Sequence, residues 1–301
     1  MTASGRPRVG VIGGSGLYQM DDLDHPEWRP MDSPFGASSD ALLFGNLGGH
    51  DVVFLSRHGR GHRVPPTDLN VRANIDVLKR AGCTEILSFT AVGSLREDLP
   101  PGTFTIIDQY IDRTFARTKT FFGPGFTAHV SMADPVCGRL GDVVTESARG
   151  LAIPVARGGT YVVMEGPQFS TRAESQLYRS WGASIIGMTA MPEAKLAREA
   201  ELCFCTVAMV TDYDCWHTTH GAVTAQQVSD VMAGNVSHAQ NLIRDVVPRL
   251  AARRELCDRG CHTALDGAVM TAPDAYDPKL VSKLDAVCGR FLAARTRGDK
   301  T

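Results

Sequence analysis

Short apolar runs recur along the chain, and each of them ends in a polar or glycine-rich motif. The clearest run covers residues 207–210 and is followed by Asp212 and Asp214. Between the runs lie amphipathic segments with a helical period, such as residues 70–81. Strands that alternate with helices predict an α/β fold. Because ligands of open α/β sheets bind outside the carboxyl ends of the strands, the pattern also predicts where a site lies.

The expected elements indicate a mixed β-sheet flanked by helices in a single domain. The pair Gly48-Gly49 between two apolar runs is a hairpin signal, and it excludes the strand, glycine loop and helix of a dinucleotide-binding unit. Strands are expected at 9–12, 41–45, 51–56, 85–89, 104–108, 161–164, 184–187 and 207–211, and helices at 70–81, 172–181, 193–200, 224–250 and 278–291. We expect one domain over residues 1–301, with 1–8 flexible and 251–301 forming an extension that packs on the core.

Composition excludes several classes of function. Lys+Arg number 31 and Asp+Glu 33, so the net charge is −2, and the absence of a basic run argues against nucleic-acid binding. No apolar stretch approaches the roughly 20 residues that cross a bilayer, and the first residues do not resemble a signal peptide. We therefore expect a cytoplasmic protein without a membrane or nucleic-acid partner.

The eight cysteines are expected to be thiols, because the cytosol is reducing. Cys203 and Cys205 lie inside an apolar run and read as small core residues. Cys257 and Cys261 form a spaced pair without a second pair nearby. A structural role for them, by packing or as an occasional disulfide, is favoured over a zinc site, which would need help from a histidine such as His262.

Three strand ends carry groups that suit a bound anion. The glycine turn around Ser15 can present backbone N–H groups and a hydroxyl, although a plain tight turn is the simpler reading. Arg57 can hold a phosphate through two parallel hydrogen bonds and His58 can add a third, whereas taken alone such an arginine more often forms a surface ion pair. Thr90 and Ala91 offer another hydroxyl and amide. Because these ends belong to one sheet, a single bound phosphate is expected.

A second group of motifs suits a purine nucleoside. Phe169 follows a Gly-Pro turn and can stack on a flat ring, although a core role is equally common, while Glu165 and Met188 are candidates to line a sugar. Asp212 and Asp214 lie two apart on a strand and should point to one spot, where one of them has to stay protonated. One ionised and one protonated carboxyl fit the N7 and 6-amino edge of a purine, whereas a calcium or magnesium site needs more oxygen ligands.

The order of these motifs resembles that of the S-methyl-5′-thioadenosine phosphorylases in the trimeric purine nucleoside phosphorylase superfamily, over roughly residues 8–250 and again in the last helix. The matching motifs are Ile12-Gly-Gly-Ser-Gly-Leu17, Pro34-Phe-Gly36, Ser56-Arg-His-Gly59, Thr90-Ala-Val-Gly-Ser-Leu-Arg96, Ile107-Asp-Gln-Tyr-Ile-Asp-Arg113, Glu165-Gly-Pro-Gln-Phe-Ser-Thr-Arg-Ala-Glu174, Met188-Thr-Ala-Met-Pro-Glu193 and Thr211-Asp-Tyr-Asp-Cys-Trp216. So many motifs in one order are specific for the superfamily.

The resemblance implies a role for each matching position. Phosphate contacts are implied at Ser15, Arg57, His58, Thr90, Ala91 and Thr189. Nucleoside contacts are implied at Phe169, Ser170, Ile186, Met188, Ala225, Val228 and Ser229, and at His129 contributed from a neighbouring subunit, while Asp212 and Asp214 serve as the catalytic groups at N7 and the 6-amino group.

The implied reaction is phosphorolysis of S-methyl-5′-thioadenosine to adenine and 5-methylthioribose 1-phosphate, in purine and methionine salvage. A protonated carboxyl, that of Asp212, would supply the proton that lets adenine leave as a neutral base, an effect worth about 10²–10⁴ in rate. Phosphate is a co-substrate, no metal or organic cofactor is implied, and the expected assembly is a homo-oligomer, a trimer or a dimer of trimers.

Several positions bear on substrate choice within the superfamily. Relatives that cleave inosine and guanosine typically carry Asn at position 212 and Glu at position 170, so Asp212 and Ser170 argue for 6-aminopurines. The small side chains at 225, 228 and 229 indicate a roomy pocket that admits adenosine as well. Gly187 replaces a commoner Asn, and the cysteines at 257 and 261 resemble those in the tail of prokaryotic members, where a disulfide is possible.

Other functions stay open from the sequence. A broader purine nucleoside phosphorylase, acting on adenosine or on 6-oxopurines, is the main alternative. A nucleoside hydrolase would call for a metal-binding aspartate cluster near the N-terminus, where the chain has Gly13-Gly14-Ser15-Gly16 instead. A non-catalytic nucleoside-binding protein would be indicated by loss of Arg57, His58 or Asp212, and the chain retains all three.

Overall fold

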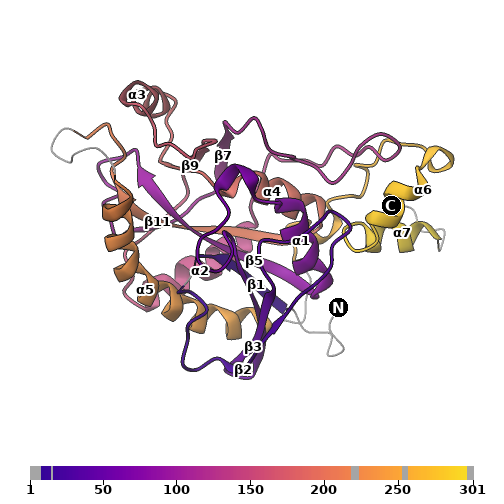
Figure 1. The fold of residues 1–301 in the computed structure, drawn as a ribbon, viewed down its shortest axis with the longest axis horizontal. Coiled ribbons are helices and arrows are strands. Elements are labelled where there is room, and N and C mark those ends of the chain that lie inside the picture. Colours follow the sequence, from indigo (N-terminus) through magenta and orange to yellow (C-terminus); the bar gives the residue numbers. More distant parts are fainter. Residues whose placement is uncertain (1–7, 15, 218–223, 253–256, 297–301) are drawn as a thin grey trace.

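The computed structural model describes residues 8–14, 16–217, 224–252 and 257–296 of the chain (Figure 1). Its strands are β1 (Arg8–Gly13), β2 (Asp24–Arg29), β3 (Leu42–Leu47), β4 (His50–Ser56), β5 (Cys83–Ser94), β6 (Phe104–Ile106), β7 (Gln109–Asp112), β8 (Val155–Arg157), β9 (Thr160–Val163), β10 (Ile185–Gly187) and β11 (Cys203–Asp212). Its helices are α1 (Val71–Arg80), α2 (Gly138–Gly150), α3 (Arg172–Ser180), α4 (Ala190–Glu199), α5 (Ala225–Ala251), α6 (Pro278–Lys283) and α7 (Gly289–Thr296), with short 3₁₀ turns at Pro66–Asp68, Cys261–Thr263 and Pro273–Ala275.

The strands form one mixed sheet. Along its main path the order is β2-β3-β4-β1-β5-β10-β9-β7, while β11 pairs with β5 and β6, and β6 also pairs with β8. Strands β4, β1, β5 and β11 run parallel to one another, and β10 is antiparallel to β5. The carboxyl ends of the four parallel strands therefore meet at one edge, so the expected α/β fold with a central mixed sheet is confirmed.

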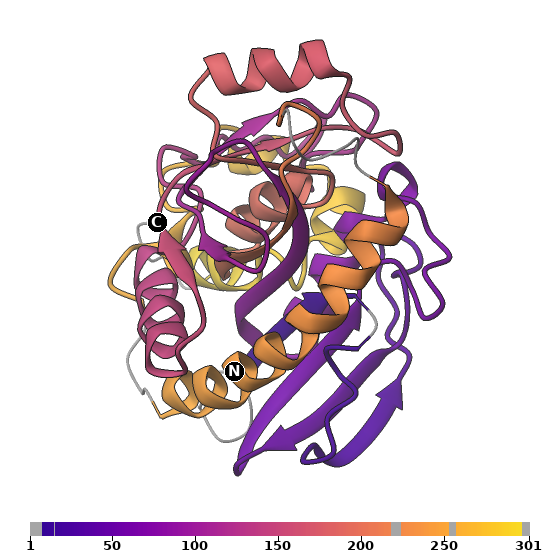
Figure 2. The ribbon, with the colours of Figure 1, turned by 90° about the vertical axis from the view of Figure 1, so that its left-hand side faces the viewer.

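Two layers of helices cover the sheet, because alternate residues of each strand point to opposite faces. In β4, Val52 and Phe54 enter one buried cluster together with residues of α2 and α5. Val53 and Leu55 enter a second cluster, with α1, α4 and the C-terminal residues up to Phe291. Figure 2 shows α5 running across the near face of the sheet, with α3 lying apart at the margin of the molecule. The helix layers leave the carboxyl edge of the sheet accessible.

The N-terminal half follows its sequence pattern closely. The hairpin of β3 and β4 turns at Gly48 and Gly49, both with positive φ. Helix α1 begins after Asn70, whose side chain accepts a hydrogen bond from the N–H of Ala73, and it buries the three apolar residues that define its face. Residues 1–7 lie outside the described part of the chain, and Arg8, which we expected to be flexible, opens β1.

Two expectations about the elements are wrong, and one helix was not expected. Thr90 and Ala91 do not end a strand, because β5 pairs with β11 as far as Gly93 and continues to Ser94. The last helix is divided into α6 and α7 by a turn at 284–288, although Leu284 and Phe291 are buried as expected. Helix α2 was not expected, since its glycines weaken the helical signal.

Short or exposed strands also escaped the sequence pattern. Strand β2 is almost entirely exposed, contains Pro26 and forms the edge of the sheet, so it lacks apolar alternation. Strands β7 and β8 have only four and three residues. Among the described residues, no helix has both the length and the apolar character that crossing a membrane requires.

Candidate active site

A cavity of about 580 Å³ lies at the carboxyl edge of the sheet. It is lined by residues of β5, β10, β11, α5 and the turns after β1, β4 and β9. Among them are the predicted site residues Arg57, His58, Thr90, Ala91, Phe169, Ser170, Ile186, Met188, Thr189, Asp212, Asp214, Ala225, Val228 and Ser229. Ser15 lies outside the described residues, but its neighbour Gly14 lines the cavity.

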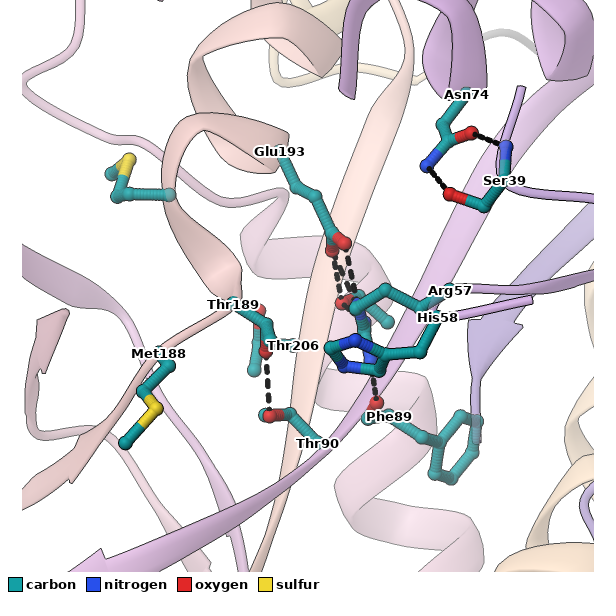
Figure 3. Close-up of polar contacts among 12 residues, drawn as sticks. Ser39, Arg57, His58, Asn74, Phe89, Thr90, Met188, Thr189, Glu193 and Thr206 are labelled. Atoms are coloured by element: carbon teal, nitrogen blue, oxygen red, sulfur yellow. Dashed lines mark hydrogen bonds and ion pairs between the residues drawn. The ribbon is translucent and has the colours of Figure 1, made fainter. Parts of the chain in front are cut away.

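Arg57 lies at one end of the cavity, but most N–H groups of its guanidinium already donate to other protein groups. Its Nε and Nη2 atoms donate to the two carboxylate oxygens of Glu193, at 2.6 and 3.2 Å, and Nη1 donates to the carbonyl oxygen of Phe89 at 2.7 Å (Figure 3). Nη2 also donates to the hydroxyl of Ser88. These bonds use four of the five N–H groups. In this structure Glu193, rather than an anion in the cavity, accepts the pair of parallel bonds that the sequence assigned to a phosphate.

His58 stands beside Arg57 as a neutral imidazole. Burial and the neighbouring Arg57 charge lower the pKa of His58 to about 4. Its Nδ1 lies 2.8 Å from the carbonyl oxygen of Val64 and donates to it, because a carbonyl can only accept. Nε2 is then the unprotonated nitrogen, so it accepts a hydrogen bond from a ligand rather than donating one. The ring also stacks on His62 with a centroid separation of 4.2 Å.

Two threonine hydroxyls complete this end of the cavity. Thr90 Oγ1 lies 2.9 Å from Thr189 Oγ1, and Figure 3 shows the two side chains meeting from β5 and from the turn before α4. Both residues are buried. Together with the backbone at Gly14, they give this end hydrogen-bonding groups without a carboxylate lining the wall. An anion fits here, next to the partly neutralised charge of Arg57.

The opposite end of the cavity holds the two aspartates. Burial raises the pKa of Asp212, against the hydrogen bonds that it accepts from Thr211 and from the N–H of Asp214. Burial also raises the pKa of Asp214, and the charge of Asp212 adds to this effect. The carboxyl pair thus favours holding a proton, as the sequence predicted.

Asp212 can gain or lose a proton without losing a hydrogen bond. The Thr211 hydroxyl lies 2.7 Å from Asp212 Oδ2 and 3.2 Å from the carbonyl oxygen of Val92. When Asp212 is ionised, Thr211 donates its single proton to the carboxylate. When Asp212 is protonated, the carboxyl donates to Thr211, which then donates to Val92. This exchange suits a group that delivers a proton.

Asp214 presents an acceptor instead. Its Oδ2 atom is buried and has no hydrogen-bond partner among the described residues. Leaving such an oxygen without a donor costs about 1–3 kcal/mol, more for a charged group. A ligand with an N–H group directed at Asp214 removes that cost.

The two carboxyl groups do not meet because they lie on the same face of one strand, as the sequence predicted. Strand β11 ends at Asp212, and Asp214 follows in a turn with φ of 51°, its N–H donating to Asp212 Oδ1 at 2.7 Å. The β5–β11 ladder shifts register between Val210 and Asp212, so that Asp212 lies opposite Gly93. A side chain on Gly93 would place Cβ only 2.8 Å from Asp212 Oδ1, so glycine is required here.

Glu165 does not line the cavity, contrary to its expected place beside the sugar. It is buried and accepts hydrogen bonds from the N–H groups of Phe115 and Ala116 and from Arg117 Nε. Burial opposes the shift, but these bonds and one from Thr67 lower the pKa of Glu165 to about 2. Glu165 therefore acts as a fixed charge behind the cavity wall.

Arg117, which the sequence did not single out, joins the segments that carry the predicted sugar and phosphate contacts. Its Nη1 donates to the carbonyl oxygens of Met188 and Met191 at 2.6 and 2.7 Å, and Nη2 donates to that of Glu165 at 2.6 Å. Its side chain is buried. The sequence around Arg117 gave no signal of this role, because the partners named here lie 48 or more residues away, and the carbonyl of Met164 lies 47 residues away.

The rest of the cavity is lined by one exposed aromatic side chain and by several small side chains. Phe169 is 45% exposed, so it is free to pack against a ligand rather than buried in the core. Ala225, Val228 and Ser229 come from the first two turns of α5, next to Met232. His129 is exposed and does not line this cavity.

The chain is similar to known proteins over nearly its whole length. Residues 8–248 match the family described as the phosphorylase superfamily. The S-methyl-5′-thioadenosine phosphorylase of Rhodospirillum rubrum is 58% identical over 287 residues, which cover 95% of this chain and 98% of that protein. The enzyme of the same name from Cereibacter sphaeroides is 55% identical over 284 residues, covering 94% and 98%.

Solved structures agree with the sequence relatives. A methylthioadenosine phosphorylase from an antarctic soil metagenomic library has a TM-score of 0.88 at 44% identity, covering 94% of this chain and 99% of that one. The methylthioadenosine phosphorylase of Schistosoma mansoni, in complex with adenine, has a TM-score of 0.77 at 36% identity, covering 82% and 93%. The resemblance carried by the sequence motifs is confirmed: the chain belongs to the phosphorylase superfamily and, within it, to the S-methyl-5′-thioadenosine phosphorylases.

Proposed function

We propose that this protein catalyses the phosphorolysis of S-methyl-5′-thioadenosine to adenine and 5-methylthioribose 1-phosphate. One observation carries the proposal. A single cavity joins an end suited to an anion, at Thr90 and Thr189, to a carboxyl pair with raised pKa values at Asp212 and Asp214. The names of the relatives and the family membership support the same reaction.

In the proposed step, a phosphate oxygen forms a bond to C1′ as the bond from C1′ to the purine nitrogen breaks. The proton of Asp212 passes to N7, so adenine leaves as a neutral base and Asp212 becomes ionised. The hydrogen phosphate gives up its own proton to water on forming the ester, and Asp212 takes a proton from water after adenine leaves, so the overall reaction transfers one proton from phosphate to adenine. Asp214 Oδ2 accepts from the 6-amino group, which gives this buried oxygen its missing donor.

Phosphate recognition relies on few direct charges in this proposal. Arg57 retains one N–H group for the ligand, because Glu193 and two other acceptors hold the rest. Neutral His58 accepts from the hydroxyl of hydrogen phosphate through Nε2, and Thr90, Thr189 and the amides near Gly14 donate. We propose no metal or organic cofactor for this reaction, with inorganic phosphate as the co-substrate.

The test is adenine release from S-methyl-5′-thioadenosine, adenosine and inosine, each with and without phosphate. We expect release from the first substrate only when phosphate is present, with inosine inert. Release without phosphate would indicate hydrolysis and overturn the anion site. Activity on inosine alone would overturn the proposal that Asp212 and Asp214 bind N7 and the 6-amino group of the purine.

Adenosine is a second proposed substrate, because the 5′ end of the cavity is lined by small or polar side chains. Ala225 and Ser229 line it without filling it, and the Ser229 hydroxyl can pair with a 5′-hydroxyl. We expect S229V to lower kcat/KM for adenosine several-fold more than for the methylthio substrate. The matched control is D230N, one residue along the same helix, which should leave the ratio of the two substrates unchanged. Equal effects of S229V on both substrates would contradict the proposal.

We further propose a cytoplasmic homotrimer, or a dimer of trimers, in which His129 reaches the 5′ group of a neighbouring subunit. His129 is exposed and lies outside its own cavity, and Phe115, a large apolar residue, is 82% exposed, which supports a covered interface. Light scattering gives the mass of the assembly. H129A and D212N should each lower activity, and mixed assemblies of the two chains should be more active than either alone, because some mixed sites combine an intact Asp212 with an intact His129. A monomer, or mixtures no more active than either chain alone, would contradict the proposal.

A further inference from the structure

Four cysteines meet at the end of the sheet opposite the cavity. The Sγ atoms of Cys137, Cys203, Cys257 and Cys261 all lie within 4.8 Å of one another, and all four residues are buried. Cys137 and Cys257 are 3.5 Å apart at sulfur. Four thiolates at about 2.3 Å from a tetrahedral zinc ion lie about 3.8 Å from one another, so the sulfurs need to move little to bind one.

The cluster is assembled from distant parts of the chain. Cys137 precedes α2, Cys203 opens β11, and Cys257 and Cys261 follow α5. The sequence suggested that a zinc site at the last two cysteines would need His262. The fold supplies Cys137 and Cys203 instead, and it leaves the His262 ring next to the cluster, with Nε2 3.8 Å from Cys203 Sγ.

N–H donors face three of the four sulfur atoms. The backbone N–H of Arg259 donates to Cys257 Sγ at 3.4 Å. The guanidinium of Arg139 donates to Cys203 Sγ at 3.5 Å, and that of Arg198 to Cys261 Sγ at 3.9 Å. Such N–H donors orient metal-bound thiolates, and the guanidinium charges offset the net negative charge of a zinc ion with four thiolates. Arg139 is itself paired with Glu85, which holds its guanidinium in place.

We propose that Cys137, Cys203, Cys257 and Cys261 bind one structural zinc ion. Four sulfur ligands in a tetrahedron are typical of zinc, and a site closed by four protein ligands leaves no position for a substrate. Cys203 and Asp212 are the first and last residues of β11, so the metal lies a strand length from the reacting atoms. Its role is to tie the segment after α5 to α2 and β11.

Zinc content of the tag-free, full-length protein tests the proposal, measured by mass spectrometry of the metal after purification under reducing conditions. We expect one zinc ion per chain. C137S and C257S should lose most of this zinc, whereas C205S and C288S, which alter buried cysteines outside the cluster, should retain it. A loss of zinc in C205S equal to that in C137S would overturn the assignment.

A second measurement does not depend on the folding of the variants. A mercurial reagent added to the wild-type protein should release zinc to a dye as the thiols react, and cobalt exchanged into the site should show the strong sulfur-to-metal absorption of a tetrahedral thiolate site. Unfolded, zinc-free protein should contain eight reactive thiols. Four thiols and no zinc would indicate two disulfides, and eight thiols and no zinc would indicate plain packing; either result overturns the proposal.

The structural role is separable from catalysis. Removing zinc with a strong chelator should lower the melting temperature, while kcat and KM below that temperature stay within about twofold of the untreated enzyme. A loss of kcat in protein that remains folded would overturn the placement of the metal away from the reaction.

Discussion

At the scale of single residues, burial decides which form each ionisable group takes in the cavity. It raises the pKa of Asp212 and of Asp214, and it lowers the pKa of His58 to about 4. At neutral pH, His58 is therefore an acceptor at Nε2, and a proton is retained more readily on the carboxyl pair than on free aspartates. The same physical effect makes the carboxyl pair easier to protonate and keeps the imidazole neutral.

Replacing Asp212 should remove the proton source. We expect D212N to lower kcat for S-methyl-5′-thioadenosine by about 10²–10⁴, because an amide cannot protonate N7. Wild-type kcat should fall as pH rises through the raised pKa of Asp212, and the residual activity of D212N should lack that fall. D98N, at an exposed aspartate paired with Arg96, is the control. A normal rate in D212N would contradict the role.

Gly187 illustrates how one residue depends on a partner far along the chain. A Cβ at this position would lie 2.2 Å from Tyr161 Oη, so a larger residue fits only if Tyr161 moves. Tyr161 is buried, and its hydroxyl has no hydrogen-bond partner among the described residues.

We expect G187A to lower the free energy of unfolding by about 1–3 kcal/mol, as overpacking does. Y161F should be nearly neutral, since it removes a buried hydroxyl that lacks a partner. The double variant G187A/Y161F should recover part of the loss, which urea unfolding of all four proteins measures. Strict additivity of the two single changes would show that the Cβ and the hydroxyl do not meet.

At the scale of elements, the site is held by contacts between loops rather than within them. Arg117 binds the carbonyl oxygens of Glu165, Met188 and Met191, which belong to the segments after β9 and after β10. The turn that carries Met188 and Thr189 is thus anchored from behind. Its position relative to the phosphate end depends on a residue that touches no ligand.

We expect R117M to lower the free energy of unfolding by about 3–5 kcal/mol, because it leaves Glu165 buried without its cation. KM for the nucleoside should rise as the Met188 turn loses its anchor. R96M, which removes an exposed arginine paired with Asp98, should change stability by less than about 1 kcal/mol. Stability and KM in R117M that match those of R96M would contradict the anchoring role.

At the scale of the whole molecule, buried charges make stability depend on pH. Burial raises the pKa of Glu199 to about 7, against hydrogen bonds from Phe121 N–H and Thr120. A carboxyl whose pKa is higher in the folded state binds more protons there than in the unfolded chain. Its contribution to stability is therefore present at low pH and is lost as pH rises from about 4.5 to about 7.

The Glu199 shift corresponds to roughly 3 kcal/mol over that range. We expect E199Q to resemble the wild type at pH 5 and to be more stable than the wild type at pH 8, because glutamine mimics the protonated acid. Denaturant unfolding at both pH values measures the difference, with E146Q on the exposed face of α2 as the control. An equal loss of stability with pH in E199Q and E146Q would contradict the assignment.

The sheet topology also acts at this scale. The parallel strands β1, β4, β5 and β11 bring residues near 14, 57, 90 and 212 to one edge. The sequence predicted that edge from the strand pattern alone, because strand ends in a parallel sheet coincide. The motifs of the site are short and continuous in the chain, so their local structure and their order were readable without the fold.

Only the tertiary structure decided how the side chains pair. Glu193 lies 136 residues from Arg57, and no local pattern links a helix-start glutamate to a distant strand-end arginine. Asp214 turns toward Asp212 through a positive φ that the strand alternation did not predict. The four cysteines meet from three segments separated by dozens of residues.

Local periodicity and motif chemistry thus determined the longer buried strands, most helices, the family and the sheet edge where the candidate site lies, because each is set by neighbours in the chain. Other features depend on contacts between segments that are remote in sequence. They are the ion pair of Arg57 with Glu193, the unpaired Oδ2 of Asp214 among the described residues, the hydrogen bonds of Arg117 and the cysteine cluster. Those contacts form when burial forces polar groups to find partners, and their partners are fixed by the packed fold.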